Sequence, residues 1–254
     1  MKISIASLIY KSTYYSDQVY ESLVEYTPQL QRDDCEFFFV ANDASDRVLE
    51  HLKKKQYPHY IHTNEKKTDK ELFAMGIGWP NYLHGVYRAW NKAIEMSKGE
   101  VVVLINSDMM FYTNWLDNLL KHVDKKKFVC SQLVERFNEK MGGIFPGCVR
   151  QEFGSSPRNF QKDNFKNFAR IYTKKNANGV KLGGAFMPCA IKKEYLLKVG
   201  GYPDGNLAGS SFEDIKEYGD RCLVRKLNEI GIQHITALDS IVYHFKEGEM
   251  EEDE

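Results

Sequence analysis

Residues 85–111, GVYRAWNKAIEMSKGEVVVLINSDMMF, give the clearest evidence of the fold class. Between residues 83 and 97, mostly apolar residues recur at three- and four-residue spacing, which is typical of a helix with one buried face. These residues are Leu83, Val86, Trp90, Ala93, Ile94 and Ser97. Gly99 ends this helix, and the apolar run that follows is typical of a buried strand. The strand ends directly on Asn106, Ser107 and Asp108. This order predicts one helix–strand unit of an α/β fold.

The same alternation of strands and helices extends over the first 125 residues and predicts a mostly parallel central sheet flanked by helices. Strands are expected at residues 2–8, 35–41, 59–63 and 100–105. Asn114 is predicted to cap the next helix, which would leave Asp108 free for another role.

The second part of the chain has a different texture. Residues 131–180 are rich in Gly, Asn, Lys and aromatic residues without a clean period, so we expect long loops with short elements there. The loop at 142–180 is interpreted as an acceptor surface, a lid or a solvated loop; its basic residues are Arg150, Arg158, Arg170, Lys174 and Lys175. A small irregular acceptor-side region is therefore expected beside the sheet.

The last elements are predicted from period and glycine positions. We expect a short helix at 192–199, a longer helix near 212–230 ending at Gly231, and a strand at 240–245. The acidic tail 247–254 is predicted to be disordered. The chain is thus expected to form one domain over 1–246, with residues 1–125 as its nucleotide-binding half and 126–246 as its acceptor half.

Composition excludes several classes of protein. Lys plus Arg and Asp plus Glu both number 35, so there is no global attraction to nucleic acid or to an anionic membrane. The cysteines number five and form no CxxC pair, which argues against a disulfide framework or a zinc ribbon and fits a reducing cytoplasm. No apolar run approaches the roughly 18 residues of a membrane span. We expect a cytoplasmic protein, and the sequence leaves peripheral membrane association open.

Polar residues stand at the ends of three predicted strands. Ser7 and Leu8 end the first strand, Asn42 and Asp43 follow the second, and residues 106–108 follow the fourth. Ligands of open α/β sheets bind outside the carboxyl ends of the strands, so these residues are predicted to meet at one site. The alternative is that they are ordinary turn and cap residues.

The common phosphate-binding motifs are missing. The sequence has neither GxxxxGK[ST] nor a GxGxxG after the first strand. A diphosphate bound here would be neutralised most simply by a divalent cation, and Asp108 could supply an oxygen ligand for it.

Residues 85–111 resemble the inverting family-2 glycosyltransferases of the GT-A fold, rhamnosyltransferase-like members included. The family has a glycine, a helix with an alanine-x-asparagine pattern, a second glycine and a DxD motif in this order. The matching residues here are Gly85, Ala89, Asn91, Gly99 and Asp108. Asp43 is similar to the family's aspartate that contacts the nucleotide base. Downstream glycine pairs, an acidic pair and a late histidine are matched by Gly183, Gly184, Gly200, Gly201, Glu213, Asp214 and His244.

The resemblance implies a metal-dependent inverting transfer of a sugar from a nucleotide-diphosphate donor of UDP, dTDP or GDP type to a glycan, lipid-linked or protein acceptor. Asp108 and His244 would bind Mn²⁺ or Mg²⁺, and an imidazole ligand favours Mn²⁺. Asp214 would be the general base and Glu213 would position it or the acceptor. The nucleotide sugar would be bound by Ser7, Leu8, Asn42, Asp43, Arg88, Asn91, Asn106, Ser107, Gly183 and Gly184.

The sequence also departs from the family pattern. Asn106 stands where the DxD motif has its first acid, which removes one negative charge and predicts weaker metal binding. Trp90 replaces an arginine and is expected to pack in the core. Lys216 stands where many relatives have a further acid, so the acceptor end is the least transferable part.

Two other functions fit the same residues. A nucleotidyltransferase would also use an α/β sheet with a divalent cation, and it would consume a nucleoside triphosphate and release pyrophosphate. A non-catalytic sugar-nucleotide-binding protein is suggested by Asn106. Donor hydrolysis that depends on Asp214 would argue against that second alternative.

Overall fold

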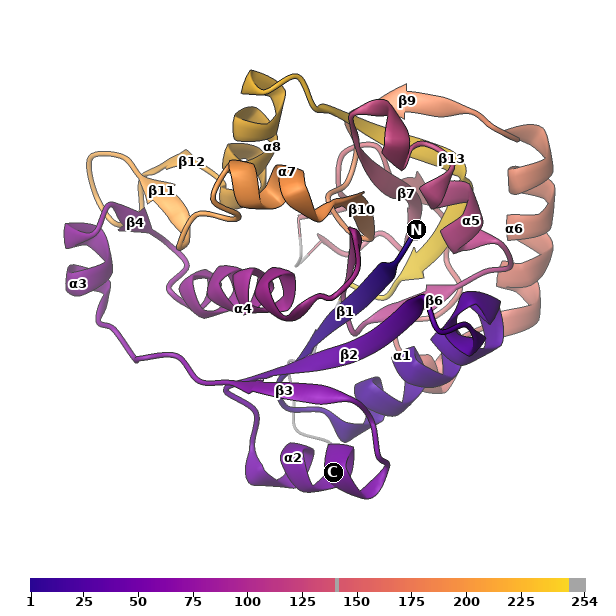
Figure 1. Ribbon diagram of the computed structural model, residues 1–254, viewed down its shortest axis with the longest axis horizontal. Coiled ribbons are helices and arrows are strands. Elements are labelled where there is room, and N and C mark those ends of the chain that lie inside the picture. Colours follow the sequence, from indigo (N-terminus) through magenta and orange to yellow (C-terminus); the bar gives the residue numbers. More distant parts are fainter. Residues whose placement is uncertain (140–141, 247–254) are drawn as a thin grey trace.

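The computed structural model describes residues 1–139 and 142–246 (Figure 1). The expected tail at 247–254 lies outside the described residues. Within the described part, no helix is both long and apolar enough to cross a membrane.

A ten-stranded mixed sheet forms the centre of the molecule, in the order β3-β2-β1-β5-β10-β7-β13-β6, with β8 beside β7 and β9 beside β13. Its strands are β1 Ile3–Ile9, β2 Cys35–Asn42, β3 His59–His62, β5 Val101–Ile105, β6 Met109–Phe111, β7 Lys127–Glu135, β8 Val149–Arg150, β9 Val180–Leu182, β10 Cys189–Lys192 and β13 Gln233–His244. The pairs β3–β2, β2–β1, β1–β5, β7–β8 and β7–β13 are parallel, whereas β10 is antiparallel to both β5 and β7. The predicted α/β class with a mostly parallel sheet is confirmed.

Helices cover the sheet on both sides. They are α1 Thr13–Tyr26, α2 Asp46–Lys54, α3 Asp69–Ala74, α4 Tyr82–Met96, α5 Trp115–Leu120, α6 Lys162–Lys175, α7 Lys193–Lys198 and α8 Gly219–Glu229, with 3₁₀ turns η1 Pro28–Gln31, η2 Val123–Lys125 and η4 Pro157–Asn159. Figure 1 shows α4, α7 and α8 on one side of the sheet and α1 and α2 on the other. A second, three-stranded sheet lies beyond the start of α4; its strands are β4 Ile77–Gly78, β11 Asn206–Ala208 and β12 Ile215–Glu217.

The predicted helix–strand unit is present as α4 and β5. Trp90, Ala93 and Ile94 are buried on the inner face of α4, and every residue of β5 is buried. Gly99 lies between them against β1: a Cβ there would stand 2.6 Å from the backbone carbon of Ile3 and from the backbone nitrogen of Ser4. Helix α4 can therefore lead directly into the centre of the sheet only because residue 99 has no side chain.

We expect Gly99→Ala to destabilise the protein by about 1–3 kcal/mol, the usual cost of overpacking a tight interior. The close atoms are backbone atoms of β1, which cannot rotate away as a side chain could. Urea unfolding of the two proteins measures the difference, with the neighbouring exposed Lys98→Ala as control. A loss below about 0.5 kcal/mol, the range of ordinary surface substitutions, would contradict this account of Gly99.

Two expectations about local structure are wrong. Asn114 stands at the start of α5 but has a left-handed backbone, with φ of 62°, and its side chain makes no capping hydrogen bond. It therefore gives no reason to regard Asp108 as free. The region 142–180 is not only loop, because α6 occupies Lys162–Lys175 and buries Phe165 and Ala169 against β13 and its neighbours. The helical periodicity of α6 is hard to recognise in its sequence because only these two of its residues are fully buried.

Candidate active site

The parallel strands of the central sheet all run in one direction, so their carboxyl ends lie along one edge. That edge receives the polar ends of β2, β5, β7 and β13. The site is built there from loops that the rigid sheet positions, as in other open α/β folds.

Asp108, Glu135 and His244 form a buried polar cluster at this edge. The Nε2 atom of His244 lies 3.1 Å from Oδ2 of Asp108, and its Nδ1 atom lies 2.7 Å from Oε1 of Glu135. Burial by itself would lower the pKa of His244, but Asp108 and Glu135 outweigh it and raise the pKa to about 10. Two carboxylates thus fix the orientation of one imidazole.

A carboxylate oxygen of Asp108 and a ring nitrogen of His244 are donor types that Mn²⁺ accepts. Their separation of 3.1 Å is that of a hydrogen bond, so a cation would have to displace the proton that His244 shares with Asp108. Glu135 would then hold the second ring nitrogen, the usual arrangement behind a metal-binding histidine. In residues 1–139 and 142–246, no group of three or more His, Cys, Asp or Glu side chains is arranged to hold a metal. A cation here would therefore need its remaining ligands from substrate or water.

Glu135 was not predicted from the sequence. It is fully buried at the end of β7 and also accepts a hydrogen bond of 2.8 Å from the backbone nitrogen of Phe145. The Phe145 ring stacks on His244, and the ammonium group of the buried Lys246 lies 4.7 Å from that ring. A carboxylate ending the apolar run 127–135 is the same signal that singled out Asp108, and it could have identified Glu135.

On the other side of the edge, Asp43 organises the loop after β3. Its two carboxylate oxygens accept hydrogen bonds of 2.8 Å from the backbone and the side chain of Asn64, and Oδ1 of Asn42 accepts another from Asn64 at 2.7 Å. Gly85 makes room for this cluster, because a Cβ there would lie 3.0 Å from the Asn64 amide. Asn42, Asp43 and Asn64 therefore present a fixed set of polar groups beside α4.

The two α4 residues named from the sequence have different surroundings. Arg88 lines an open cavity of about 370 Å³ whose other lining residues are His62, Asn91, Lys92, Glu95 and Asp204. Asn91 uses both ends of its amide on the backbone of Tyr202, at 2.9 and 3.0 Å. Its hydrogen-bonding capacity is thus largely spent on holding the turn at 200–202 against α4.

The remaining predicted nucleotide-site residues lie in or near strand ends. Ser7 is buried within β1 and its hydroxyl donates to the carbonyl of Leu8 at 3.3 Å, while β1 continues to Ile9. Asn106 and Ser107 are half-buried directly after β5. These positions place Asn106 and Ser107 next to Asp108 at the open edge.

The glycine pair 183–184 is required by its own packing. Gly183 and Gly184 have φ of 66° and 119°, and a Cβ on Gly184 would lie 2.2 Å from Oγ1 of Thr236 on β13. Gly184 also packs on Gly147, close to the segment that covers Glu135. The pair therefore bends the chain and lets the backbone lie close to β13.

Glu213 and Asp214 do not begin a helix, which corrects the expected helix at 212–230. They lie in the exposed connection between β11 and β12, and α8 starts only at Gly219. The Asp214 carboxylate accepts hydrogen bonds of 2.8 and 2.9 Å from the backbone and hydroxyl of Ser210, and these bonds lower its pKa. A hydroxyl of Ser211 donates to Glu213. Both acids are thus engaged in closing their own hairpin.

Asp220, in the first turn of α8, has a raised pKa, whereas the pKa of Asp214 is lowered. Burial raises the pKa of Asp220 to about 6, against a hydrogen bond from Tyr87 that lowers it. The residue nevertheless keeps partial solvent exposure. Its hydrogen-bond partner Tyr87 lies on α4, the helix that leads into β5 and Asp108. Asp220 is therefore held against the helix–strand unit that carries Asp108.

Buried contacts fix the start of α8. The amide of Asn206 accepts from the backbone nitrogen of Gly219 at 2.9 Å and donates to the carbonyl of Trp79 at 2.8 Å. Gly219 packs flat on Tyr87, since a Cβ there would stand 2.3 Å from the ring. These contacts come from distant parts of the chain, which is why the helix start was misplaced from sequence.

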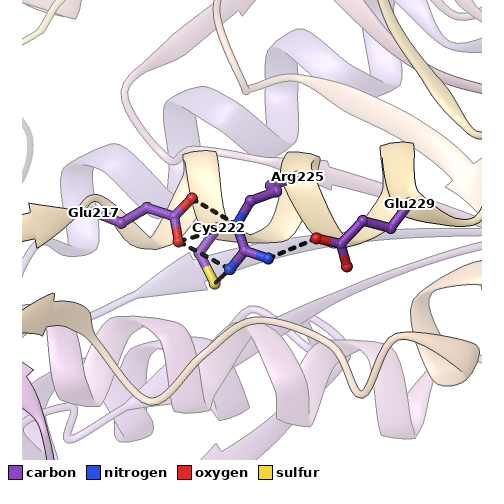
Figure 2. Close-up of polar contacts among 4 residues, drawn as sticks. All are labelled: Glu217, Cys222, Arg225 and Glu229. Carbon is purple, nitrogen blue, oxygen red and sulfur yellow. Dashed lines mark hydrogen bonds and ion pairs between the residues drawn. The ribbon is translucent and has the colours of Figure 1, made fainter.

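Farther along α8, Arg225 ties the helix to the small sheet. Figure 2 shows its guanidinium group forked on the Glu217 carboxylate, with Nε and Nη2 both at 3.0 Å, and bonded to Glu229 on the other side at 2.8 Å. Glu217 is the last residue of β12. The ion pair thus fixes the hairpin of Glu213 and Asp214 relative to α8.

The mostly parallel sheet, flanked by helices and carrying a carboxylate–histidine pair at its carboxyl edge, has the GT-A fold. The family model described as glycosyl transferase family 2 matches residues 80–187, which include α4, β5 and Asp108. The resemblance seen in the sequence is confirmed. No curated protein sequence matches the chain significantly.

Solved structures show the same fold at low sequence identity. GalNAc-T7 with UDP, GalNAc and Mn²⁺ superposes with a TM-score of 0.57 at 14% identity, over 96% of this chain and 44% of that chain. The mannosyltransferase PcManGT from Pyrobaculum calidifontis, in complex with GDP-Man and Mn²⁺, gives 0.56 at 18% identity over 96% and 56%. TarS 1–349 of S. aureus gives 0.54 at 14% identity over 96% and 60%. The chain therefore spans about half the length of these proteins.

Proposed function

We propose that the protein is a metal-dependent inverting glycosyltransferase that moves a sugar from a nucleotide-diphosphate donor to an acceptor hydroxyl. The observation that carries the proposal is the contact between Asp108 and His244, backed by Glu135, at the carboxyl edge of a GT-A sheet. The family-2 match over this segment, and the Mn²⁺ and nucleotide complexes of the structural neighbours, support it.

In the proposed site, Asp108 and His244 hold Mn²⁺ or Mg²⁺, and the cation supplies neutralisation of the leaving diphosphate. Asp43 with Asn42 and Asn64 holds the base end of the donor. Asn106 and Ser107, directly after β5, hold the ribose and diphosphate region, with Leu8 and Arg88 nearby. Ser7 is fully buried within β1, so it can support this edge only from inside the sheet. Gly183 and Gly184 border the sugar.

We assign the general base to Asp220 in place of Asp214. A base works best with a pKa near the working pH; burial raises that of Asp220 to about 6, whereas the Ser210 hydrogen bonds lower that of Asp214. Asp220 would take the proton of the acceptor hydroxyl as its oxygen attacks the sugar opposite the departing diphosphate. Such in-line attack inverts the anomeric configuration.

Donor binding can be tested before the acceptor is known. We expect UDP, dTDP or GDP to raise the melting temperature only when Mn²⁺ is present, because a ligand that binds the folded state stabilises it by mass action. At a ligand concentration 100 times the dissociation constant, the gain is about 2.7 kcal/mol. The measurement is a thermal-shift panel of these nucleotides and their sugars with Mn²⁺ or EDTA.

The same panel separates the alternatives. Slow hydrolysis of one nucleotide sugar in the absence of an acceptor would support a glycosyltransferase. Consumption of a nucleoside triphosphate with pyrophosphate release would instead identify a nucleotidyltransferase. Binding of a nucleotide sugar without any turnover, even with acceptors supplied, would identify a non-catalytic binding protein.

A further inference from the structure

Three exposed aromatic residues stand on chain segments that meet at the start of α8. The exposed fractions of Trp79, Tyr82 and Tyr218 are 57%, 65% and 51%. Phe73 and Met75, at the end of α3, are exposed as well. Apolar surface of this kind, concentrated in one region, marks an interaction site more often than isolated exposed residues do.

These aromatic residues stand on a rigid frame that also holds Asp220. The backbone nitrogen of Trp79 donates to the carbonyl of Phe212 at 2.7 Å, and its carbonyl accepts from Asn206, which also binds Gly219. Tyr218 directly precedes Gly219, and Tyr82 begins α4, the helix whose Tyr87 ring packs against Gly219. One buried amide therefore connects the Trp79 backbone to the residue before Asp220.

The charge of this region restricts the class of ligand that it could bind. Residues 69–82 and 203–220 contain seven carboxylates and only two lysines. Arg221 lies over the ring of Tyr218, and Arg225 is paired with Glu217 and Glu229. Such a surface repels a phosphorylated or sulfated ligand and an anionic membrane. It suits an uncharged ligand that has both hydroxyl groups and apolar C–H faces.

We propose that Trp79, with Tyr82 and Tyr218 beside it, is the acceptor platform of this enzyme and stacks on a pyranose ring of a neutral glycan. An indole ring offers a broad apolar face and loses little conformational entropy on binding. Because Asn206 bonds both the Trp79 carbonyl and the Gly219 nitrogen, a sugar ring on Trp79 would lie near the start of α8, where Asp220 stands. The proposal rests on the proposed function, and it selects a neutral glycan from the glycan, lipid-linked and protein acceptors.

The test uses the full-length chain on a printed array of neutral, sialylated and sulfated glycans. We expect retention on one group of neutral glycans, and a loss of ten-fold or more in Trp79→Ala. Leu197→Ala on α7 is the matched control, because Leu197 is 60% exposed. Vesicles of phosphatidylglycerol are tested in parallel by sedimentation.

A second measurement uses the tryptophans themselves. Trp90 and Trp115 are 4% and 0% exposed, so quenching by acrylamide reports mainly on Trp79. We expect the retained glycan, added in solution, to protect this residue from acrylamide. Acrylamide is uncharged, so the acidic surface does not bias the result.

Several outcomes would overturn the platform. They are equal retention of wild type and Trp79→Ala, retention on anionic glycans or vesicles only, retention on no glycan at all, and quenching unchanged by the glycan. Donor hydrolysis in the absence of an acceptor is measured on the same variants and should be unchanged in Trp79→Ala. If hydrolysis is present while the platform fails, only this inference falls; if wild type neither binds nor hydrolyses any donor, the proposed function falls too.

Discussion

Replacing Asp220 by Asn is expected to reduce sugar transfer by about two to four orders of magnitude, the usual contribution of a general base. Asn keeps the size of the side chain and can still accept the hydrogen bond from Tyr87, but it cannot take a proton. Donor affinity should stay within about two-fold, because the substitution leaves the proposed metal ligands Asp108 and His244 unchanged. Transfer rates at saturating donor, together with nucleotide binding, measure the two effects separately.

Asp214→Asn is the matched control for this prediction. Its carboxylate is exposed and engaged by Ser210, so we expect less than about a three-fold change in transfer. If Asp214→Asn abolishes transfer while Asp220→Asn retains it, the base assignment must return to the residue that the sequence suggested.

The pH dependence should follow from the raised pKa of Asp220. Below about pH 6 the carboxylate is protonated and cannot act as a base, so the transfer rate should fall as the pH falls through this value. In Asp220→Asn the remaining slow rate should lack this step. The measurement is the rate at saturating substrates between pH 5 and 8.

Stability should respond in the opposite sense to activity. The pKa of Asp220 is higher in the folded than in the unfolded state, so ionisation above about pH 4 costs stability, and the cost is complete above about pH 6. Asp220→Asn should therefore be more stable than wild type at pH 7, by about 1–3 kcal/mol. The difference should vanish near pH 3.5, where Asp220 is protonated in both states. Urea unfolding at the two pH values measures it.

Local sequence patterns predicted Asn106 and Asp108, because these residues directly follow a strand that is recognisable from its own sequence. The apolar run before Asn106 and Asp108 needed no distant partner to be recognised as a buried strand, and the strand direction placed Asp108 at the sheet edge. His244 came from the family resemblance, and the structure brings it to Asp108 through the antiparallel pairing of β13 with β6, in which His244 stands opposite Met109.

The errors arose where distant contacts decide the local structure. Two adjacent acids looked like the first turn of a helix starting at residue 212, but Asn206 and Tyr87 fix the start of α8 seven residues later, at Gly219. The apolar residues Cys222, Leu223 and Leu227 belong to α8, and with Gly231 they could have placed its first turn at Asp220. Glu135 was missed because β7 was expected to be loop beyond residue 130, and only its pairing with β13 shows otherwise.

Asp108→Asn is expected to lower Mn²⁺-dependent nucleotide binding and to reduce turnover by about 10²–10³-fold, the scale for loss of one preorganised electrostatic group. The reason is charge. Asn106 has already removed one acid from this motif, so Asp108 is the negative ligand on which a cation between it and His244 depends. The substitution preserves shape, so the fold should survive, which circular dichroism checks.

Asp17→Asn is a matched control, because Asp17 also pairs with a histidine. Its Oδ1 lies 2.8 Å from Nε2 of His51 on the far side of the sheet from α8, in a contact between α1 and α2. If Asp108→Asn and Asp17→Asn both leave Mn²⁺-dependent donor hydrolysis unchanged, the buried pair of Asp108 and His244 is a structural ion pair and the cation lies elsewhere. If only Asp108→Asn loses Mn²⁺-dependent hydrolysis, and added Mn²⁺ partly restores the rate, the substitution has lowered the affinity for the metal. That result would mean that one carboxylate, with a histidine oriented by Glu135, can replace the two acids of the DxD motif.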